Sequence, residues 1–403
     1  MMLRSPNSSP AARLKRIVLA CLVLYCCYLV VGLSLVAFGA LQKLYLCPGW
    51  SVKGPHSSRD TSGFAADGPL VFYQGQLLIS KQIAPRGRAL VLFTDTLPAG
   101  PHPTVTCFVQ EAQRAFRVPL RGAAVVPADT YPAPEKLLAI SDIEGNFLGF
   151  EHLLLGAGVV DAQLNWHFGQ GHLVLVGDFF DRGLNVTECL WLIYKLEQEA
   201  AQAGGQVHFI LGNHERMNLT GHYKYVRRKY RVNADTLGVP YARWYDRTTV
   251  LGRWLRTKNV VEKIGTTLFV HGGISPEVAA LGLSLTRLND LARASLKAPG
   301  LSAVEKQVTQ PPGSLDWYRG LVQQAPTEAQ VAQVLATYAA TRLVVGHTPV
   351  QKISALYHGK VIALDTPHQQ LTDAGQPLQA LWLVNETVRA LDSNGYQEPL
   401  AGN

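Results

Sequence analysis

The feature that most constrains the fold is a series of short apolar runs, each of which ends in a polar cluster. Three of these runs are typical of buried strands: Leu137–Ile140, Leu173–Val176 and Val207–Leu211. Helix-like stretches near Phe147–Leu155 and from Val186 to Ala200 separate them. Strands that alternate with helices predict an α/β fold. Ligands of such folds lie beyond the carboxyl ends of the strands, so we expect the polar clusters to meet there.

Five polar clusters of this kind occur, and glycine is part of each. They are Ser141–Asn146 (SDIEGN), Gly177–Gly183 (GDFFDRG), Gly212–Glu215 (GNHE), His271–Gly273 (HGG) and Gly346–Thr348 (GHT). Carboxylates, imidazoles and amide oxygens are suitable ligands for divalent first-row metals, and glycine lets the backbone turn sharply toward a common centre. Two cations about 3.5–4 Å apart can bind phosphoryl oxygens and acidify a water between them. The pattern therefore favours phosphoester chemistry, with Asp178 as the candidate bridging ligand.

The five clusters, in this order, resemble the motifs GDxHG, GDxxDRG, GNHE, HGG and GH of the calcineurin-like metallophosphoesterases. Within that family they are similar to the phosphoprotein-phosphatase branch, and the resemblance covers roughly Lys136 to Leu391. Gly212–Leu219, the Tyr225-Val226 that follows and Trp317–Arg319 look like the bacterial Shewanella-like phosphatases. The resemblance implies a metallophosphoesterase-type α-β-β-α sandwich at residues 134–397.

The resemblance also implies two divalent metal ions, of the Mn, Fe or Zn type with Mn favoured, and a role for each matching residue. The implied metal ligands are Asp142, Glu144, Asp178, Asn213, His271 and His347. His214 resembles the general acid that protonates the leaving oxygen, and Asp181 would orient it. Arg182 and Arg319 resemble the two arginines that hold phosphate, to which a guanidinium can bind bidentately. Glu215 is expected to hold a neighbour rather than react.

Two residues depart from the family pattern: Ser141 stands where the motif has glycine, which is a small change, and Glu144 stands where it has histidine. Three interpretations are open. Glu144 ligates the first metal and favours harder ions such as Mn²⁺ or Mg²⁺; it acts through a water; or the site is degenerate and the protein is a non-catalytic binder. The function expected from the remaining motifs is hydrolysis of phosphomonoesters, small or on a phosphoprotein, by metal-bound hydroxide. A phosphodiesterase or a dinucleoside polyphosphate hydrolase is the alternative within the same chemistry.

The N-terminal part predicts a membrane anchor. Residues 17–41 form an uncharged, almost wholly apolar run, which is long enough to cross a hydrocarbon core of about 30 Å. Four basic residues precede it: Arg4, Arg13, Lys15 and Arg16. Basic residues stay on the cytoplasmic side, so residues 1–16 are expected inside and the catalytic domain outside, in the periplasm of a bacterium. A cleaved signal peptide is the alternative, although its apolar region is usually about 7–15 residues.

Two further segments separate this anchor from the motif region. Residues 42–68 are rich in Ser, Gly, Asp and Pro, which is typical of a linker. Residues 69–130 contain short apolar runs punctuated by glycine and proline, which predict a small β domain. This domain contains no catalytic constellation, so a spacer or docking role is expected.

The net charge of +8 suggests an anionic partner, and it is unevenly distributed. Lys224–Lys263 holds 11 lysines and arginines against three acids, with tyrosines and tryptophans interleaved. Basic and aromatic residues together can bind nucleic acid. The predicted membrane topology places this stretch outside the cytoplasm, which argues against nucleic acid as the partner. We expect a helical cap, either with solvated basic faces or drawing anionic phosphoesters toward the metal centre. The six cysteines are too few for a disulfide scaffold.

Overall fold

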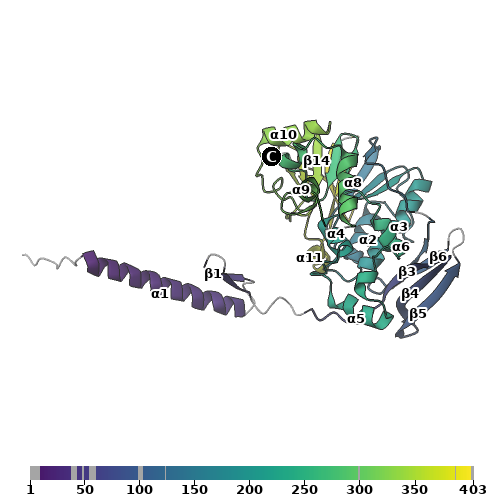
Figure 1. The fold of residues 1–403 in the computed structure, drawn as a ribbon, viewed down its shortest axis with the longest axis horizontal. Coiled ribbons are helices and arrows are strands. Elements are labelled where there is room, and N and C mark those ends of the chain that lie inside the picture. The colour runs from purple at the N-terminus through teal and green to yellow at the C-terminus, as the bar shows by residue number, and fades with distance from the viewer. Residues whose placement is uncertain are drawn as a thin grey trace, which may run out of the picture. The chain divides into compact units, whose positions relative to one another are not determined.

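The computed structural model describes residues 10–37, 43–47, 50–53, 60–98, 103–122, 124–297, 300–385 and 387–400. The chain divides into two compact units, Met1–Ser62 and Gly63–Asn403. The second unit contains two six-stranded sheets with helices packed against them, so the predicted α/β class is confirmed (Figure 1).

The first unit consists of one long helix and a hairpin. Helix α1 spans Pro10–Ala37, and its Leu14–Ser34 segment has a mean hydropathy of 2.5 with 6% of the window buried. Length and composition therefore allow this helix to cross a membrane, and a signal sequence would have the same properties. Strands β1 (Lys43–Cys47) and β2 (Trp50–Lys53) pair antiparallel within the segment predicted as a linker. Residues 1–9 and 38–42 of the predicted tail and span lie outside the described residues.

Two sheets of mixed strand direction form the centre of the second unit. The first has the strand order β11-β10-β9-β17-β18-β19, with β9 Lys136–Ile140, β10 His172–Leu175, β11 Gln206–Phe209, β17 Gln379–Val384, β18 Thr387–Asp392 and β19 Gln397–Pro399. The second has the order β15-β16-β14-β13-β12-β8, with β8 Thr130–Tyr131, β12 Val261–Ile264, β13 Thr267–Val270, β14 Arg342–Val345, β15 Ser354–Leu356 and β16 Val361–Ala363. Strands β9, β10 and β11 are parallel, and so are β13, β14 and β16. Each sheet thus directs several strand ends to one edge.

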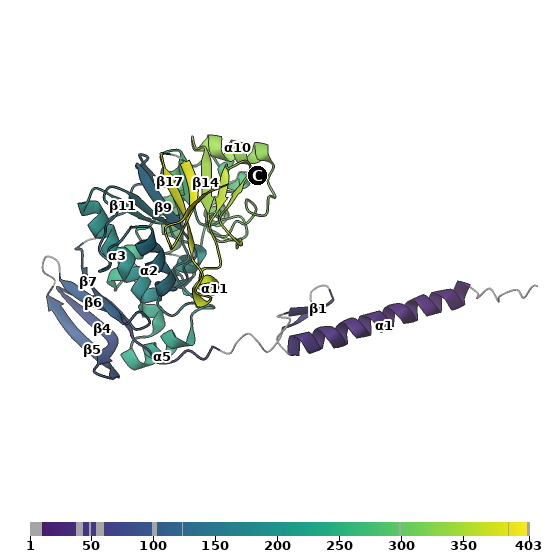
Figure 2. The same ribbon diagram turned by 180° about the vertical axis from the view of Figure 1, so that it is seen from behind.

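The two sheets contribute to one buried cluster, which explains the unbroken apolar runs in the sequence. Leu137 and Ala139 of β9 pack in this cluster with Phe269 of β13, whereas Leu138 and Ile140 belong to the larger core that the helices cover. Because successive side chains of a strand point to opposite faces, β9 is apolar on both sides. Figure 2 shows β9 and β17, which are neighbours in the first sheet, and β14 of the second sheet.

Helices pack on the sheets and complete the core. The described helices of this unit are α2 Phe147–Gly156, α3 Val186–Gln202, α4 Asn213–Leu219, α5 Arg228–Leu237, η1 Tyr241–Arg243, α6 Val250–Leu255, α7 Pro276–Ala279, α8 Leu285–Ser295, α9 Ala303–Thr309, α10 Glu328–Thr337 and α11 His368–Asp373. Helix α3 contacts β11, and α8 contacts β12. The N-caps of several helices have the predicted chemistry: Asn146, for example, accepts the N–H of Gly149 at 3.0 Å and starts α2.

The predicted β segment belongs to the same compact unit as the two sheets. Its strands are β3 Asp67–Gln74, β4 Leu77–Arg86 and β5 Ala89–Pro98 in one sheet, and β6 Thr104–Val109 with β7 Arg114–Pro119 in a hairpin. Their apolar side chains, such as Leu70 and Val118, share a core with the wholly buried Trp191 of α3. The indole N–H of Trp191 donates to the carbonyl of Pro69 at 2.8 Å. The boundary expected after residue 130 is therefore not a boundary between compact units.

The basic stretch between Lys224 and Lys263 forms helices α5, η1 and α6, as a helical cap requires. Four of its six aromatic residues are buried, namely Tyr230, Trp244, Tyr245 and Trp254; Tyr230 and Trp244 are each 1% exposed and pack edge-on at 6.1 Å. Several of its cations have fixed partners, such as Lys258, which lies 2.7 Å from Glu197. Buried rings cannot stack on bases, so this arrangement does not favour a nucleic-acid surface.

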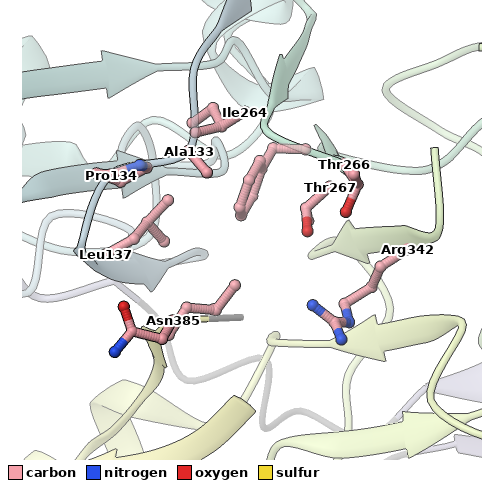
Figure 3. Close-up of a pocket in the computed structure, with 10 residues that line it drawn as sticks. Ala133, Pro134, Leu137, Ile264, Thr266, Thr267, Arg342 and Asn385 are labelled. Carbon is pink, nitrogen blue, oxygen red and sulfur yellow. The ribbon is translucent and has the colours of Figure 1, made fainter. Parts of the chain in front are cut away.

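A small cavity of about 30 Å³ lies at the amino ends of the parallel strands (Figure 3). Leu137 near the start of β9, Thr267 at the start of β13 and Arg342 at the start of β14 are among its lining residues. It is too small for a substrate, and the predicted site residues follow the opposite, carboxyl ends of these strands. Function therefore concentrates at that other edge.

Substitution of Trp191 tests whether the β segment is part of the core. Trp191→Ala removes a wholly buried indole, so we expect a loss of about 3–5 kcal/mol in the free energy of unfolding, measured with urea on Gly63–Asn403. Val125→Ala, at a side chain that is 76% exposed, should change it by less than about 0.5 kcal/mol. A Trp191→Ala loss no larger than that of the control would contradict a shared core.

Candidate metal centre

The predicted site residues follow the carboxyl ends of neighbouring strands and contact one another. Asp142 lies two residues beyond β9, His271 directly follows β13, and His347 lies two residues beyond β14. The backbone N–H of His347 donates to Oδ2 of Asp142 at 3.1 Å, which links the second sheet to the first. The backbone N–H of Glu144 donates to the carbonyl of Asp178 at 2.9 Å, so the first two clusters are also joined.

Left-handed backbone turns direct these side chains into the centre. The φ angles of Asp142, Asp178 and His347 are 55°, 59° and 63°. Non-glycine residues avoid this region, and such conformations concentrate at functional sites where the surrounding structure enforces them. The turn brings the backbone of Gly177 close to that of Gly212. A Cβ on residue 177 would lie 2.6 Å from the backbone nitrogen of Gly212, so the turn needs glycine at this position.

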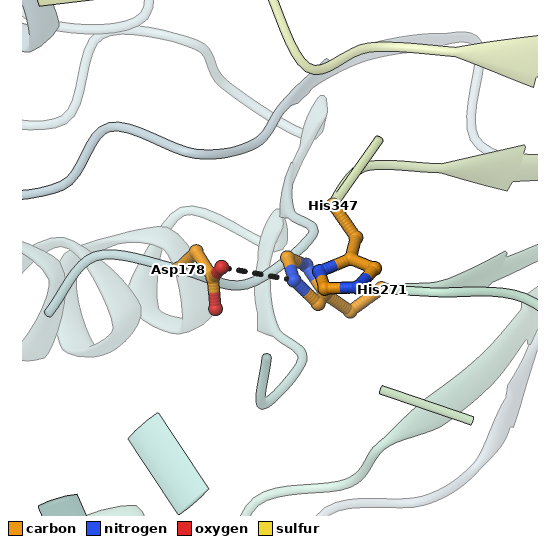
Figure 4. Close-up of side chains that lie close together, drawn as sticks. All are labelled: Asp178, His271 and His347. Atoms are coloured by element: carbon orange, nitrogen blue, oxygen red, sulfur yellow. Dashed lines mark ion pairs between the residues drawn. The ribbon is translucent and has the colours of Figure 1, made fainter. Parts of the chain in front are cut away.

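Asp178 lies close to two histidines of the centre. Its Oδ2 lies 3.1 Å from Nε2 of His271 and 3.8 Å from Nε2 of His214 (Figure 4 shows the first pair). Burial would raise the pKa of Asp178, but the charges of His271 and His214 outweigh it and hold the pKa below its usual range. Burial likewise would lower the pKa of His271, and the Asp178 carboxylate instead raises it to about 10. Asp178 is thus a carboxylate in the position expected of a bridging ligand.

The atoms around Asp178 fit a divalent metal ion. The side-chain amide of Asn213 lies 2.8 Å from Nδ1 of His347, 3.0 Å from Nε2 of His271 and 3.2 Å from Oδ2 of Asp178. Nε2 of His347 is buried without a hydrogen-bond partner among the described residues. Burial and the charge of His271 lower the pKa of His347 to about 3. Ligand atoms of Asp178, His271 and His347 all lie within 4.8 Å of one another, and so do those of Glu144, Asp178 and His214.

His214 is arranged as a proton donor. Its Nδ1 lies 2.7 Å from Oδ2 of Asp181, which is wholly buried and also accepts the side-chain N–H of Asn218 at 3.1 Å. Burial opposes the charged imidazole, but Asp178 and Asp181 raise the pKa of His214 to about 9. A protonated His214 can therefore give a proton from Nε2, and Asp181 lies where the prediction puts the residue that orients it.

The two predicted arginines contact different residues of the centre. Arg182 forms an ion pair with Glu144 and lies over the ring of Tyr225, with 5.7 Å between guanidinium carbon and ring centroid. Burial raises the pKa of Glu144 to about 8 against the opposing charge of Arg182. Arg319 donates to the carbonyl of His347 at 2.7 Å. Both guanidinium groups thus border the cluster of metal-ligating atoms.

Glu215 holds the turn that carries Asp178. Its carboxylate accepts the backbone N–H groups of Asp178 (2.8 Å), Phe179 (2.7 Å) and Gly212 (2.7 Å). The side chain is wholly buried, and burial raises its pKa to about 7. These contacts are the ones expected from the sequence for Glu215, a residue that holds its neighbours in place.

The sequence interpretation missed two residues beside the centre, Asp365 and His368. Asp365 lies two residues beyond β16 and lines a cavity of about 510 Å³ together with Asp142, Glu144 and Arg182. Burial, then the charges of Asp142 and Glu144, raise the pKa of Asp365 to about 9. His368 is buried on the wall of the same cavity. The signal was the apolar run Val361–Leu364 before Asp365, which no glycine follows.

A second cavity, of about 550 Å³, opens from Asn213 on the other side of the centre. Tyr225 and Trp317 form aromatic walls: the Tyr225 ring lies 5.1 Å from the His214 ring, and the Trp317 ring 5.5 Å from the His347 ring. Arg216 lines it as well and is held by Asp316 at 2.9 Å. The cavity therefore offers an aromatic and cationic surface next to the proton donor.

Parallel strand ends that converge on carboxylate, imidazole and amide ligands, beside a proton donor, define a metal-dependent α/β hydrolase. The model of the family described as calcineurin-like phosphoesterase matches residues 135–351. The chain belongs to this family and is a metal-dependent phosphoric ester hydrolase, so the resemblance read from the motifs is confirmed.

Three proteins of known name or structure are similar to the chain. Shewanella-like protein phosphatase 1 of Plasmodium berghei is 26% identical over 260 residues, which cover 60% of this chain and 69% of the relative. Shewanella-like protein phosphatase 2 of Arabidopsis thaliana is 29% identical over 205 residues, 40% of this chain and 52% of the relative. The crystal structure of a cold-active protein-tyrosine phosphatase from a psychrophilic Shewanella is 32% identical, with a TM-score of 0.72, and covers 84% of this chain and 100% of its own.

Substitution of Glu215 tests its role in holding the Asp178 turn. In Glu215→Gln an amide NH₂ faces backbone N–H donors, so we expect the free energy of unfolding to fall by about 1–3 kcal/mol. The measurement is urea unfolding of Gly63–Asn403 without added metal, with the exposed Glu135→Gln as matched control. Equal midpoints for both variants would refute the role.

Proposed function

We propose that the protein is a membrane-anchored phosphomonoesterase that uses two divalent metal ions. The observation that carries the proposal is the convergence of acceptor atoms on Asp178 directly beside protonated His214. Asp142 and Asp178 would serve the first ion, and Asp178, Asn213, His271 and His347 the second. Manganese is the favoured metal, because carboxylates contribute much of the ligand set. The donor atoms gathered around Asp178, together with His214, support an enzyme rather than a degenerate binding protein.

Arginine and histidine side chains would carry out the other steps of the reaction. When bound, the two cations supply neutralising charge and an acidified water at the phosphoryl group. Arg182 and Arg319 would bind phosphoryl oxygens from either side and stabilise the charge that develops on them. His214 would give its Nε2 proton to the leaving oxygen, while Asp181 keeps Nδ1 protonated and the ring in place.

The substrate that fits best is a phosphoprotein, with phosphotyrosine as the preferred residue. The cavity beside His214 has the aromatic walls Tyr225 and Trp317, on which the ring of an aryl phosphate can pack. The similar Shewanella structure is titled a protein-tyrosine phosphatase. The cavity is open, which suits a peptide substrate better than a dinucleotide. A phosphodiesterase or a dinucleoside polyphosphate hydrolase is therefore the less favoured function. Nucleic acid is not a favoured partner.

Helix α1 is proposed as a single-pass anchor with a cytoplasmic N-terminus. Its support is the apolar Leu14–Ser34 segment and the basic residues Lys15 and Arg16 at its start. The catalytic unit would then lie outside the cytoplasm, in the periplasm of a bacterium, and meet extracytoplasmic phosphoesters.

Hydrolysis of an aryl phosphate tests the proposed function. The chain is expected to turn over with Mn²⁺ and to lose activity with a chelator. Asp178→Asn removes the shared carboxylate and should lower kcat by at least about 10³-fold, with an unchanged circular dichroism spectrum. An active chelated enzyme, or an Asp178→Asn variant with wild-type kcat, would refute the two-metal proposal.

Substitution of Tyr225 tests the aromatic substrate class. Loss of one ring contact should raise the KM for phosphotyrosine peptides about threefold to tenfold in Tyr225→Ala, and leave the KM for an alkyl phosphate nearly unchanged. Tyr396→Ala, at a side chain that is 67% exposed, is the control and should change neither constant. An equal rise for both substrates would argue against aromatic packing.

Extraction at alkaline pH tests the anchor. The full chain should stay in the membrane pellet, and Gly63–Asn403 should be released. Protease added outside spheroplasts should then digest the catalytic unit of the full chain. Release of the full chain, or complete protection from protease, would contradict the proposed topology.

A further inference from the structure

We propose that Asp365 is a ligand of the first metal ion, in the position that Glu144 leaves open because it pairs with Arg182. This inference rests on the proposed two-metal function and assigns one further residue to the centre.

The register of the second sheet places Asp365 beside a metal ligand. Strands β14 and β16 are parallel, and Val345 pairs with Ala363. His347 and Asp365 each lie two residues beyond this pair, so the two chains leave the sheet together at the same edge. The backbone N–H of Val350 donates to the carbonyl of Asp365 at 2.8 Å, which ties this turn to the segment that follows His347. Asp365 therefore repeats the placement of His347, which is a proposed ligand at a strand end.

Asp365 lies among other acidic side chains and has no ion-pair partner among the described residues. It lines the cavity of about 510 Å³ together with Asp142 and Glu144, so three carboxylates surround one space. Within the described residues, no hydrogen bond or ion pair reaches the Asp365 carboxylate, whereas Arg182 is already paired with Glu144. Burying carboxylates together is costly unless a cation or hydrogen bonds compensate their charge.

His368 is a second, independent sign that this cavity takes a ligand. It is 2% exposed and lines the same cavity, and its Nδ1 has no hydrogen-bond partner in the described part of the chain. A buried polar nitrogen without a partner is costly in an empty apolar space. Ligand water on a metal ion bound by Asp142 and Asp365 would supply that partner.

Glu144 has a different role beside this cavity, because it holds Arg182. Its ion pair holds Arg182, whose guanidinium also lies 3.5 Å from Nε2 of His214 and over the ring of Tyr225. If Glu144 turned to a metal ion, Arg182 would lose this partner. The assignment of the ligand role to Asp365 keeps Arg182 at the edge of the centre.

Metal content of the full chain in detergent tests the assignment. After chelation and reloading with Mn²⁺, elemental analysis should find two ions per wild-type chain. Asp365→Asn and Asp365→Ser should keep one tightly bound ion, and the Mn²⁺ dissociation constant of the other, read by electron paramagnetic resonance, should rise about 10–100-fold. Glu144→Gln should keep two ions. Asp373→Asn, an exposed acid on α11, is the matched control and should also keep two.

The outcomes separate this inference from the function on which it rests. Two tightly bound ions in both Asp365 variants overturn the inference, and so does loss of an ion in Glu144→Gln alone. A wild-type chain that binds no Mn²⁺ refutes the two-metal proposal itself. Urea midpoints are measured without metal, so that a variant that fails to fold is recognised, and the remaining Asp365 variant then decides.

Discussion

The centre depends on one buried carboxylate, Asp178, and on the contacts that keep it ionised and fixed. His271 lies 3.1 Å from its Oδ2, and the backbone N–H of His214 donates to its Oδ1 at 2.9 Å. The backbone of the same turn is held by Glu215 through three neighbouring N–H groups. A carboxylate this deeply buried is stable only with positive partners, so the same contacts that hold Asp178 also prepare the centre for cations.

The two sheets make this convergence possible because their parallel strands end at a common edge. Residues one or two positions beyond β9, β13 and β14 supply Asp142, His271 and His347. The backbone is left-handed at Asp142 and at His347, which redirects the chain after β9 and after β14. The β segment before the sheets contributes no metal-ligating side chain among the described residues, but Trp191 fixes it against α3 and makes it part of the same core.

The sequence predicted those parts of the fold and site in which local chemistry and position agree. Strands β9 and β10 are apolar after their first residue, and Asp142 and Asp178 follow them within three residues, in motifs that contain glycine. Prediction was weaker where tertiary packing decides. The strands of residues 69–119 look like an independent domain by pattern, since nothing local reveals that α3 fills their apolar face. Asp365 was missed because only the register between β14 and β16 brings it to His347.

Positive charge at the centre is fixed before any substrate arrives. Arg319 is held by the carbonyl of His347 at 2.7 Å, Arg216 by Asp316 at 2.9 Å, and Arg182 by Glu144. Cations that are already oriented need little reorganisation when a phosphate group enters, which is how an enzyme lowers the barrier for charge that develops later. The net charge of +8 is therefore a poor guide to the partner by itself. In the proposed function the guanidinium groups near His214 and the proposed metal ligands bind the phosphoester, while cations such as Lys258 have acidic partners within the fold.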